Sequence, residues 1–233
     1  MLQGVNLTVE RGSSMVIIGG SGTGKSVLLK TVVGLVTPDS GRIFVDGQDI
    51  RKKNPSNFLK RFGMLFQGGA LFDSMPVWQN VAFRLQSGEL KQTNKHAREI
   101  AIEKLRRVGL SPDIADQLPA ELSGGMQKRV GLARAIAANP EIIFFDEPTT
   151  GLDPIMAGII NELIQEIVVE TGVTAITITH DMSSVDAIAD TVAMLHDGII
   201  QWSGPKKNFR KCGDPFVNQF INGRANGPIE TLR

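Results

Sequence analysis

The 233-residue chain contains one cysteine, no tyrosine and no long apolar run. Because Cys212 has no second cysteine to pair with, no disulfide can form within the chain, which suits a reducing compartment. No apolar stretch approaches the roughly 18–20 residues that a membrane-spanning helix needs. Residues 1–6 also lack the basic start and apolar segment of a signal peptide. If the protein serves a membrane, we therefore expect it to act through another chain.

An excess of one sign of charge is also missing. The sequence holds 25 Lys and Arg against 24 Asp and Glu, which gives a net charge of +1 at pH 7. A balance so close to zero provides no overall field that would attract nucleic acid, so we expect no nucleic-acid partner. The length suits one large domain, or one domain with a subdomain.

Three continuous apolar or β-branched runs predict buried strands, at residues 15–18, 142–145 and 174–179. Such runs are typical of strands that are covered on both faces of a parallel sheet. Helical patterns lie between them. One covers residues 27–36, and another begins at Asp153 and Pro154, a helix cap followed by proline at the first helical position. The second pattern ends at Gly172. This alternation predicts an α/β fold with a parallel-sheet core.

Two further features depart from that core. Asp46-Gly47 and Asp197-Gly198 each separate two apolar segments, which predicts two antiparallel hairpins. Residues 70–138 are mostly helical in pattern, with Glu103 and Arg107 one turn apart, a spacing that favours an ion pair. We therefore predict a single domain over residues 1–233, with three parts: an α/β core over 1–69 and 139–203, an inserted helical subdomain over 70–138, and a C-terminal tail over 204–233.

A glycine-rich loop follows the first predicted strand, with the sequence Gly19-Gly20-Ser21-Gly22-Thr23-Gly24-Lys25-Ser26. Glycines lack Cβ, so the backbone can curl and aim several N–H groups at one phosphate. The following helix adds the positive end of its dipole. Lys25 can reach the β- and γ-phosphate oxygens, and Ser26 can bind Mg²⁺. A strand before the loop and a helix after it favour a nucleotide site over a ligand-free turn.

Two carboxylates, Asp146 and Glu147, end the second predicted strand. Ligands bind at this edge of open α/β sheets. We expect Asp146 to hold Mg²⁺, directly or through water, and Glu147 to orient or deprotonate the attacking water. The alternative is an acidic pair that caps the turn before Pro148.

Gln67 and His180 each follow a predicted strand, at residues 62–66 and 174–179. The Gln67 amide can touch the metal or the water and can also sense a neighbouring domain. His180 can donate to the γ-phosphate. Taken singly, a surface glutamine and a structural histidine are the simpler interpretations, and only the assembled set of motifs favours a functional role for both.

A second glycine-rich turn, Ser123-Gly124-Gly125, begins a helix that carries Gln127, Arg129 and Arg134. This helix start is a second anion-binding site. Because the loop at residues 19–26 already holds one set of phosphates, the second turn suggests a nucleotide held by another copy of the chain. The alternative is a simple capping turn.

In order and spacing, these motifs resemble the nucleotide-binding subunit of ABC transporters over essentially the whole chain. The matching motifs are the Walker A loop at 19–26, the Q-loop at Gln67, the signature at 122–126, Walker B at 142–147, the D-loop at 151–153 and the switch residue His180.

The resemblance implies a P-loop NTPase with a RecA-like core and an ATPase activity that uses ATP and Mg²⁺. It implies a head-to-tail homodimer in which two ATP molecules lie between the Walker A loop of one copy and Ser123–Gly125 of the other. The catalytic residues would be Glu147, His180 and Gln67, and the metal ligands Ser26, Gln67 and Asp146. Val27 and Asp153 would join the loop residues in contacting the nucleotide.

A narrower resemblance, to the Mce-type, maintenance-of-lipid-asymmetry subfamily, rests on residues 64–74, 81–83, 217–223 and 227–228. It implies phospholipid transport between membranes from the cytoplasmic face of the inner membrane. The implied partners are an integral membrane permease, an MCE-domain substrate-binding protein and a STAS-domain regulator. The alternatives are the ATPase of an amino-acid or metal importer and, more remotely, a non-transport ABC ATPase or a P-loop kinase.

The sequence departs from the family in two places. Residues 1–18 contain no aromatic residue to stack on the adenine, an interaction worth roughly 1–3 kcal/mol. Either a segment that precedes this start supplies one, or apolar residues such as Val5 and Val9 hold the base. Val27 also stands where a second hydroxyl usually follows Ser26.

Overall fold

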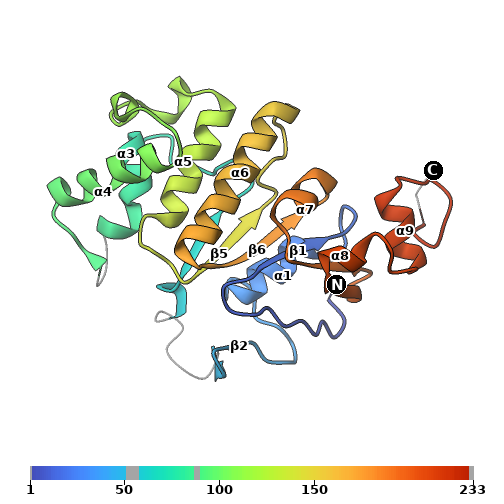
Figure 1. The fold of residues 1–233 in the computed structure, drawn as a ribbon. Coiled ribbons are helices and arrows are strands. Elements are labelled where there is room, and N and C mark those ends of the chain that lie inside the picture. The colour runs from blue at the N-terminus through green and yellow to red at the C-terminus, as the bar shows by residue number, and fades with distance from the viewer. Residues whose placement is uncertain (1, 51–57, 87–89, 231–233) are drawn as a thin grey trace.

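The computed structural model describes residues 2–50, 58–86 and 90–230. Within them, a six-stranded sheet runs through the centre of the molecule in the order β4-β5-β6-β1-β7-β8 (Figure 1). The strands are β1 (Ser14–Ile18), β4 (Phe62–Leu65), β5 (Ile142–Asp146), β6 (Thr174–Thr179), β7 (Thr191–His196) and β8 (Ile199–Pro205). All neighbouring pairs are parallel except β7 and β8. The predicted α/β fold with a parallel core is confirmed.

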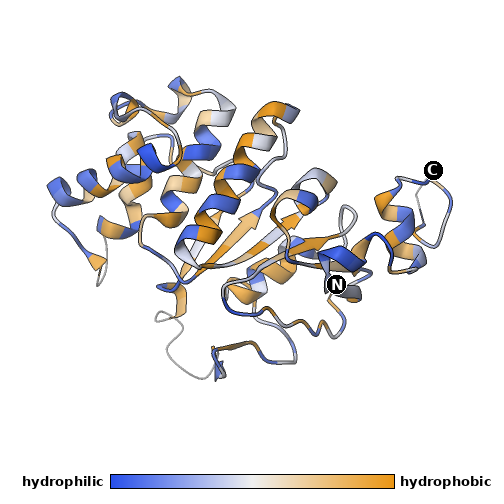
Figure 2. Cartoon of the chain, in the orientation of Figure 1, coloured by the Kyte–Doolittle hydropathy of each residue, from blue (hydrophilic) through white to orange (hydrophobic). Residues whose placement is uncertain are grey.

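The central strands are buried because both faces of the sheet are covered. Every residue of β1 is buried, and its side chains alternate between two apolar clusters. Val16 and Ile18 pack with α6 (Pro154–Thr171) and α7 (Met182–Ile188), whereas Met15 and Ile17 pack with α1 (Lys25–Val32). The strands are correspondingly rich in hydrophobic residues in Figure 2. The three predicted buried strands are confirmed.

The helix boundaries agree less uniformly with the sequence. Helix α6 has the predicted start, since the Asp153 carboxylate accepts hydrogen bonds from two backbone N–H groups at 3.0 Å. It ends as predicted at Gly172, which has φ 64°. Helix α1, however, covers Lys25–Val32 rather than residues 27–36. Gly34 adopts φ 80° just after it, and a left-handed residue at this position terminates a helix.

Both predicted hairpins are confirmed. β2 (Phe44–Val45) pairs antiparallel with β3 (Gln48–Asp49), and β7 pairs antiparallel with β8. Asp46-Gly47 and Asp197-Gly198 have positive φ at both positions, between 45° and 77°. Two consecutive left-handed residues are what a tight two-residue hairpin turn requires.

Residues 70–138 are helical as predicted. The segment contains α3 (Val77–Ala82), α4 (Asn94–Arg107) and α5 (Gly124–Ile136), with short 3₁₀ turns at Phe83–Gln86, Pro112–Ile114 and Pro119–Glu121. The three α-helices pack on one another, and α5 also packs on β4. A Cβ at Gly131 of α5 would lie 2.8 Å from Leu65 Cδ1 of that strand. Helix α5 therefore belongs to both the helical segment and the core, and the boundary at residues 138 and 139 stays a prediction.

The ion pair expected within α4 does not form. Arg107 instead contacts Glu166 at 3.1 Å and Glu170 at 2.8 Å, both on α6, whereas Glu103 contacts Lys104. Because two carboxylates on α6 face the end of α4, they attract Arg107 more strongly than one carboxylate on its own helix.

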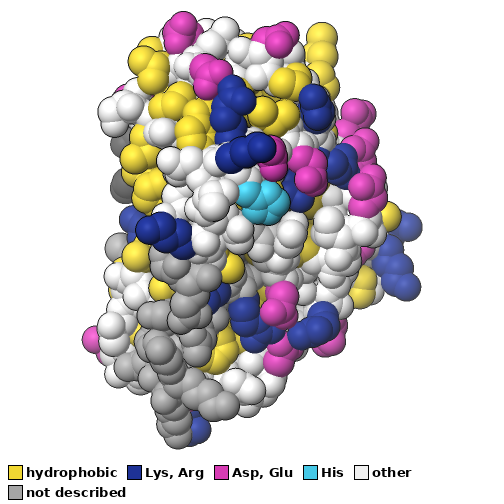
Figure 3. All heavy atoms as spheres, turned by 90° about the vertical axis from the view of Figure 1, so that its left-hand side faces the viewer, with side chains coloured by type: hydrophobic (Ala, Val, Ile, Leu, Met, Phe, Trp, Pro, Cys, Tyr) yellow, Lys and Arg dark blue, Asp and Glu magenta, His cyan; other side chains and the backbone are white. Residues whose placement is uncertain are grey.

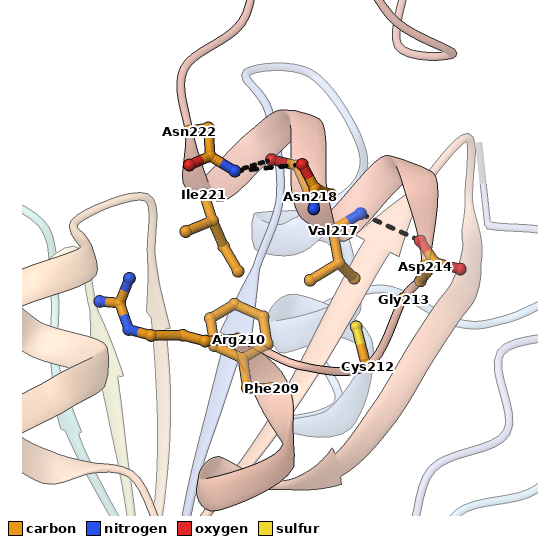
Figure 4. A pocket seen from close by; sticks show the side chains of 9 residues that line it. All are labelled: Phe209, Arg210, Cys212, Gly213, Asp214, Val217, Asn218, Ile221 and Asn222. Carbon is orange, nitrogen blue, oxygen red and sulfur yellow. Dashed lines mark hydrogen bonds between the residues drawn. The ribbon is translucent and has the colours of Figure 1, made fainter.

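The C-terminal tail packs against the core through α8 (Lys206–Phe209) and α9 (Pro215–Ile221). Phe209 and Val217 are buried. With Cys212 and Ile221 they point toward one another and line a small pocket, while Arg210 extends away from them (Figure 4). The Arg210 guanidinium reaches Asp186 of α7 at 2.5 Å. One basic side chain of the C-terminal tail is therefore paired within the chain.

The surface mixes side chains of different kinds. On the face turned to the viewer in Figure 3, basic, acidic and hydrophobic side chains lie close together. Among the described residues, no helix has both the length and the apolar character to cross a bilayer.

Candidate functional site

Three adjacent parallel strands bring most of the predicted site residues to one edge of the sheet. The order β5-β6-β1 and the parallel pairing place the carboxyl ends of these strands together. The glycine loop leaves β1, Asp146 and Glu147 end β5, and His180 follows β6. Residues far apart in the sequence therefore meet where open α/β sheets bind ligands.

The loop at residues 19–26 has the curled backbone that its glycines allow. Gly22 and Gly24 adopt φ 78° and 102°, which other residues reach only with strain. A Cβ at Gly19 would lie 2.3 Å from the Leu195 carbonyl oxygen, so no side chain fits there. Thr23 Oγ1 donates to the Gly20 carbonyl at 3.0 Å. Ser21 and Ser26 are exposed, and Val27 is half-buried.

The Lys25 ammonium lies inside this loop. Its Nζ donates to the carbonyl oxygens of Gly19 at 2.7 Å and Gly20 at 2.8 Å. Burial lowers the Lys25 pKa, and the nearby charges of Glu147 and Asp146 act in the opposite direction. A buried cation within a glycine-rich loop suits a polyphosphate, because the anion would stabilise the charged form.

Asp146 presents a carboxylate oxygen that lacks a partner. Among the described residues, its Oδ1 is buried and accepts no hydrogen bond. Burial raises the Asp146 pKa, the Glu147 charge raises it further, and Lys30 and Lys25 oppose both effects. An unpartnered carboxylate beside a second carboxylate favours a cation, and Mg²⁺ prefers oxygen ligands. The unpartnered Asp146 oxygen therefore fits Mg²⁺.

Glu147 is held in an unusual and well-defined position. Its φ is 49°, in the left-handed region that is rare for residues other than glycine. Its carboxylate lies 2.9 Å from His180 Nδ1 and accepts a hydrogen bond from Thr150 Oγ1 at 3.0 Å. Its backbone N–H donates to the Ile178 carbonyl at 2.9 Å. A carboxylate oriented in this way, next to a histidine, can hold and deprotonate a water molecule.

The remaining predicted residues lie in other parts of the molecule. Ser123 caps α5, where its Oγ accepts from the Met126 N–H at 3.3 Å, and both Ser123 and Gly124 are exposed. Gly125 is buried, and a Cβ there would lie 2.7 Å from the terminal methyl group of Met156. No hydrogen bond or ion pair joins this turn to the glycine loop within the described part of the chain. An exposed helix start of this kind is free to meet an anion from outside the chain.

Gln67 is exposed in a loop whose next three residues, 68–70, all have positive φ. Arg134 of α5 holds this loop by donating to the carbonyls of Gly69 at 2.6 Å and Ala70 at 2.9 Å. Asp153 uses its Oδ1 to cap α6, so its predicted contact with nucleotide stays a prediction. Val5 and Val9 are half-buried against the apolar cluster under α1.

Sequence reasoning missed Lys128, Thr150 and Asp181. Lys128 is only 6% exposed and donates to the carbonyls of Pro148, at 3.0 Å, and Thr150. Asp181 caps α7 and accepts from the hydroxyls of Ser183, Ser184 and Thr149. In the sequence, a lysine next to Arg129 on a predicted helix is typical of a solvent-exposed helix face. No spacing pattern distinguishes this buried lysine from an exposed one.

Comparison with known proteins agrees with this geometry. A profile of the family described as "ABC transporter" matches residues 2–150. The dimeric structure of the ATP-binding cassette MJ0796, in a post-hydrolysis state with ADP and Pi, superposes with a TM-score of 0.80 at 30% identity, covering 88% of this chain and 90% of that one. CbiO1 from Clostridium perfringens, part of the cbiONQ transporter complex, also gives a TM-score of 0.80, at 32% identity, covering 96% of this chain and 88% of that one.

Two curated relatives extend the match to 97% of this chain. The intermembrane phospholipid transport system ATP-binding protein MlaF of Escherichia coli (strain K12) is 42% identical, and the chain covers 84% of it. The "Probable ribonucleotide transport ATP-binding protein mkl" of Mycobacterium tuberculosis (strain ATCC 25618 / H37Rv) is 41% identical, and the chain spans 63% of its length. The fold and site are those of an ATP-binding cassette. The chain belongs to the ABC transporter family.

Proposed function

We propose that this chain is the ATP-hydrolysing subunit of a transporter that moves phospholipid between membranes. The convergence of Lys25, Asp146 and Glu147 at one sheet edge carries the ATPase part of the proposal, since it joins a phosphate grip, a cation ligand and a general base. The 42% identity to MlaF, over 84% of its length, supports the phospholipid part.

We assign the residues the following roles in this proposal. The loop N–H groups and Lys25 bind the β- and γ-phosphates, and Val27 and Asp153 complete the nucleotide contacts. Ser26, Asp146 and Gln67 would hold Mg²⁺, which when bound would supply positive charge that stabilises the phosphate oxygens. Glu147 accepts a proton from water, and His180 orients that carboxylate and contacts the γ-phosphate. The water oxygen bonds to the γ-phosphorus, the bond to the β–γ bridging oxygen breaks, and ADP and phosphate leave.

The active unit is a dimer of two copies. Ser123 caps a 13-residue helix, and Ser123 and Gly124 stand exposed at its start. In the proposed assembly each turn grips the nucleotide of the other copy. The dimeric MJ0796 cassette supports this arrangement by similarity.

The dimer works beneath an integral membrane permease, as a peripheral protein on the cytoplasmic face of the inner membrane. An MCE-domain substrate-binding protein and a STAS-domain regulator complete the proposed complex. Gln67 is suited to transmit motion, because Arg134 ties its loop to α5. The name of mkl points instead to ribonucleotide transport. We favour phospholipid because the chain covers more of MlaF.

The proposal is tested by purifying the tagged full-length chain from its native membrane in mild detergent and identifying the proteins that accompany it. An untagged strain is the control. We expect a permease that spans the membrane several times, together with an MCE-domain protein. A permease with a small-solute-binding protein would overturn the phospholipid assignment, and the absence of any membrane protein would overturn the transporter assignment.

A further inference from the structure

Lys128 is a buried cation whose position links two parts of the site. Its side chain is 6% exposed, and its ammonium donates to the backbone carbonyls of Pro148, at 3.0 Å, and Thr150. Lysine is rarely buried without a defined partner, because removing the charge from water is costly. The two carbonyls are therefore a specific binding site for this ammonium.

The two ends of this contact lie on elements with different roles. Lys128 sits in α5, four residues after Gly124, at the start of the helix proposed to grip the other copy's nucleotide. The turn of residues 148–150 directly follows Glu147. Thr150 donates its hydroxyl to the Glu147 carboxylate at 3.0 Å and its N–H to the Glu147 carbonyl at 3.3 Å. The Lys128 ammonium thus joins α5 to the turn of residues 148–150, which follows the proposed base Glu147.

The other side of this turn is anchored to α7. Thr149 Oγ1 lies 3.3 Å from Asp181 Oδ2 and 3.2 Å from Ser184 Oγ. Glu147 itself has φ 49°, a conformation that persists only where its surroundings fix it. Lys128 supplies the anchor on the α5 side. Without it, two carbonyls lose their donor and the turn can relax.

We propose that Lys128 is a positioning residue that couples the Ser123–Gly125 helix start to the Glu147 carboxylate. This inference rests on the proposed function, because it takes Glu147 as the base. When α5 shifts as it grips the nucleotide of the second copy, the ammonium carries that shift to the 148–150 turn. Glu147 is then aligned only when the dimer has closed. Burial lowers the pKa of the Lys128 ammonium, and the nearby Glu147 charge opposes that effect.

The test compares Lys128→Met with Lys128→Arg in the full-length chain, in the assembly with which it copurifies. Methionine keeps the apolar stem and loses the donors, whereas arginine keeps several donors. We expect Lys128→Met to lower the ATPase kcat by about 10- to 100-fold, since small misplacements of catalytic groups have effects of this size. KM should stay within about twofold, because Lys25 still binds the phosphates. Lys128→Arg should recover most of the rate. Lys95→Met, at an exposed site on α4, is the matched control.

A double-mutant cycle separates positioning from mere structural support. If Lys128 acts through Glu147, Lys128→Met should lower the residual rate of Glu147→Gln no further. Two results would overturn the inference. One is a double variant whose fold-loss in kcat equals the product of the two single fold-losses. The other is a Lys128→Met kcat within about twofold of the parent. If Lys128→Met fails to fold, Lys128→Gln takes its place in the same cycle. A Glu147→Gln protein with the parent rate would instead overturn the proposed function, so the two failures are distinguishable.

Discussion

At the scale of single residues, two neighbouring carboxylates have different surroundings and therefore different chemistry. The Glu147 carboxylate contacts the His180 ring nitrogen and accepts a hydrogen bond from the Thr150 hydroxyl. Asp146 keeps a buried oxygen without a partner within the described residues, and burial and the Glu147 charge raise its pKa. A carboxylate in that state destabilises the empty protein and becomes favourable only when a cation arrives.

Replacing Asp146 with asparagine should therefore stabilise the nucleotide-free protein while abolishing Mg²⁺-dependent ATPase activity. We expect a gain of about 1 kcal/mol at pH 8, or roughly 2–4 °C in Tm for a chain of this size, measured by thermal unfolding without metal or nucleotide. Asp39→Asn, at an exposed site, is the control.

The pH dependence of this gain has a definite sign. Because the Asp146 pKa is raised in the folded protein, its charge destabilises the fold at neutral and alkaline pH. The penalty disappears below the unfolded pKa of about 4, where the group is protonated in both states. The advantage of Asp146→Asn should shrink to zero in acid. An advantage that is independent of pH would contradict this explanation.

At the scale of elements, the turn after β6 depends on Asp181. This residue caps α7 through the Ser183 N–H at 2.9 Å and accepts from the Ser184 hydroxyl at 2.9 Å. Burial tends to raise its pKa, but the hydrogen bonds from Ser183 and Ser184 outweigh that effect and leave the pKa lowered. The same carboxylate accepts a hydrogen bond from the Thr149 hydroxyl and so also stabilises the turn that follows Glu147.

Asp181→Ala should reduce the free energy of unfolding by about 1 kcal/mol at pH 7, the usual loss for a removed helix cap. Since the Asp181 pKa is lowered on folding, its contribution is present above the unfolded pKa of about 4 and is lost as pH falls through the folded pKa. Urea unfolding at pH 7 and pH 3 measures this directly. A loss of stability that is equal at both pH values would show that the carboxylate charge is not responsible.

Local features of the sequence predicted most of the elements. The strands at 15–18 and 142–145 and the turns at Asp46-Gly47 and Asp197-Gly198 follow from patterns within a few residues of one another. The premature end of α1 and the partners of Arg107 do not, because they depend on Gly34 geometry and on the approach of α6. Lys128 was missed for the same reason, because its ammonium donates to two backbone carbonyls about twenty residues away in the sequence.

At the scale of the whole molecule, we propose that two glycine-rich elements of one chain serve different nucleotides. The glycine loop, Asp146 and Glu147 share one sheet edge, whereas Ser123 and Gly124 stand exposed at the start of α5. Contacts from Arg134 and Lys128 connect α5 to the Gln67 loop and to the Glu147 turn. Closure of the proposed dimer at the start of α5 would therefore reach both the turn after Glu147 and the Gln67 loop.

The most direct measurement is the mass of the Glu147→Gln chain in solution, by light scattering after gel filtration. With Mg-ATP we predict a dimer of twice the 25.2 kDa chain, and with Mg-ADP or no nucleotide a monomer. Adding Ser123→Arg, which places a bulky side chain at the exposed helix start, should keep the chain monomeric with Mg-ATP. A mass that does not respond to ATP, or a dimer that is indifferent to Ser123→Arg, would contradict the shared nucleotide site.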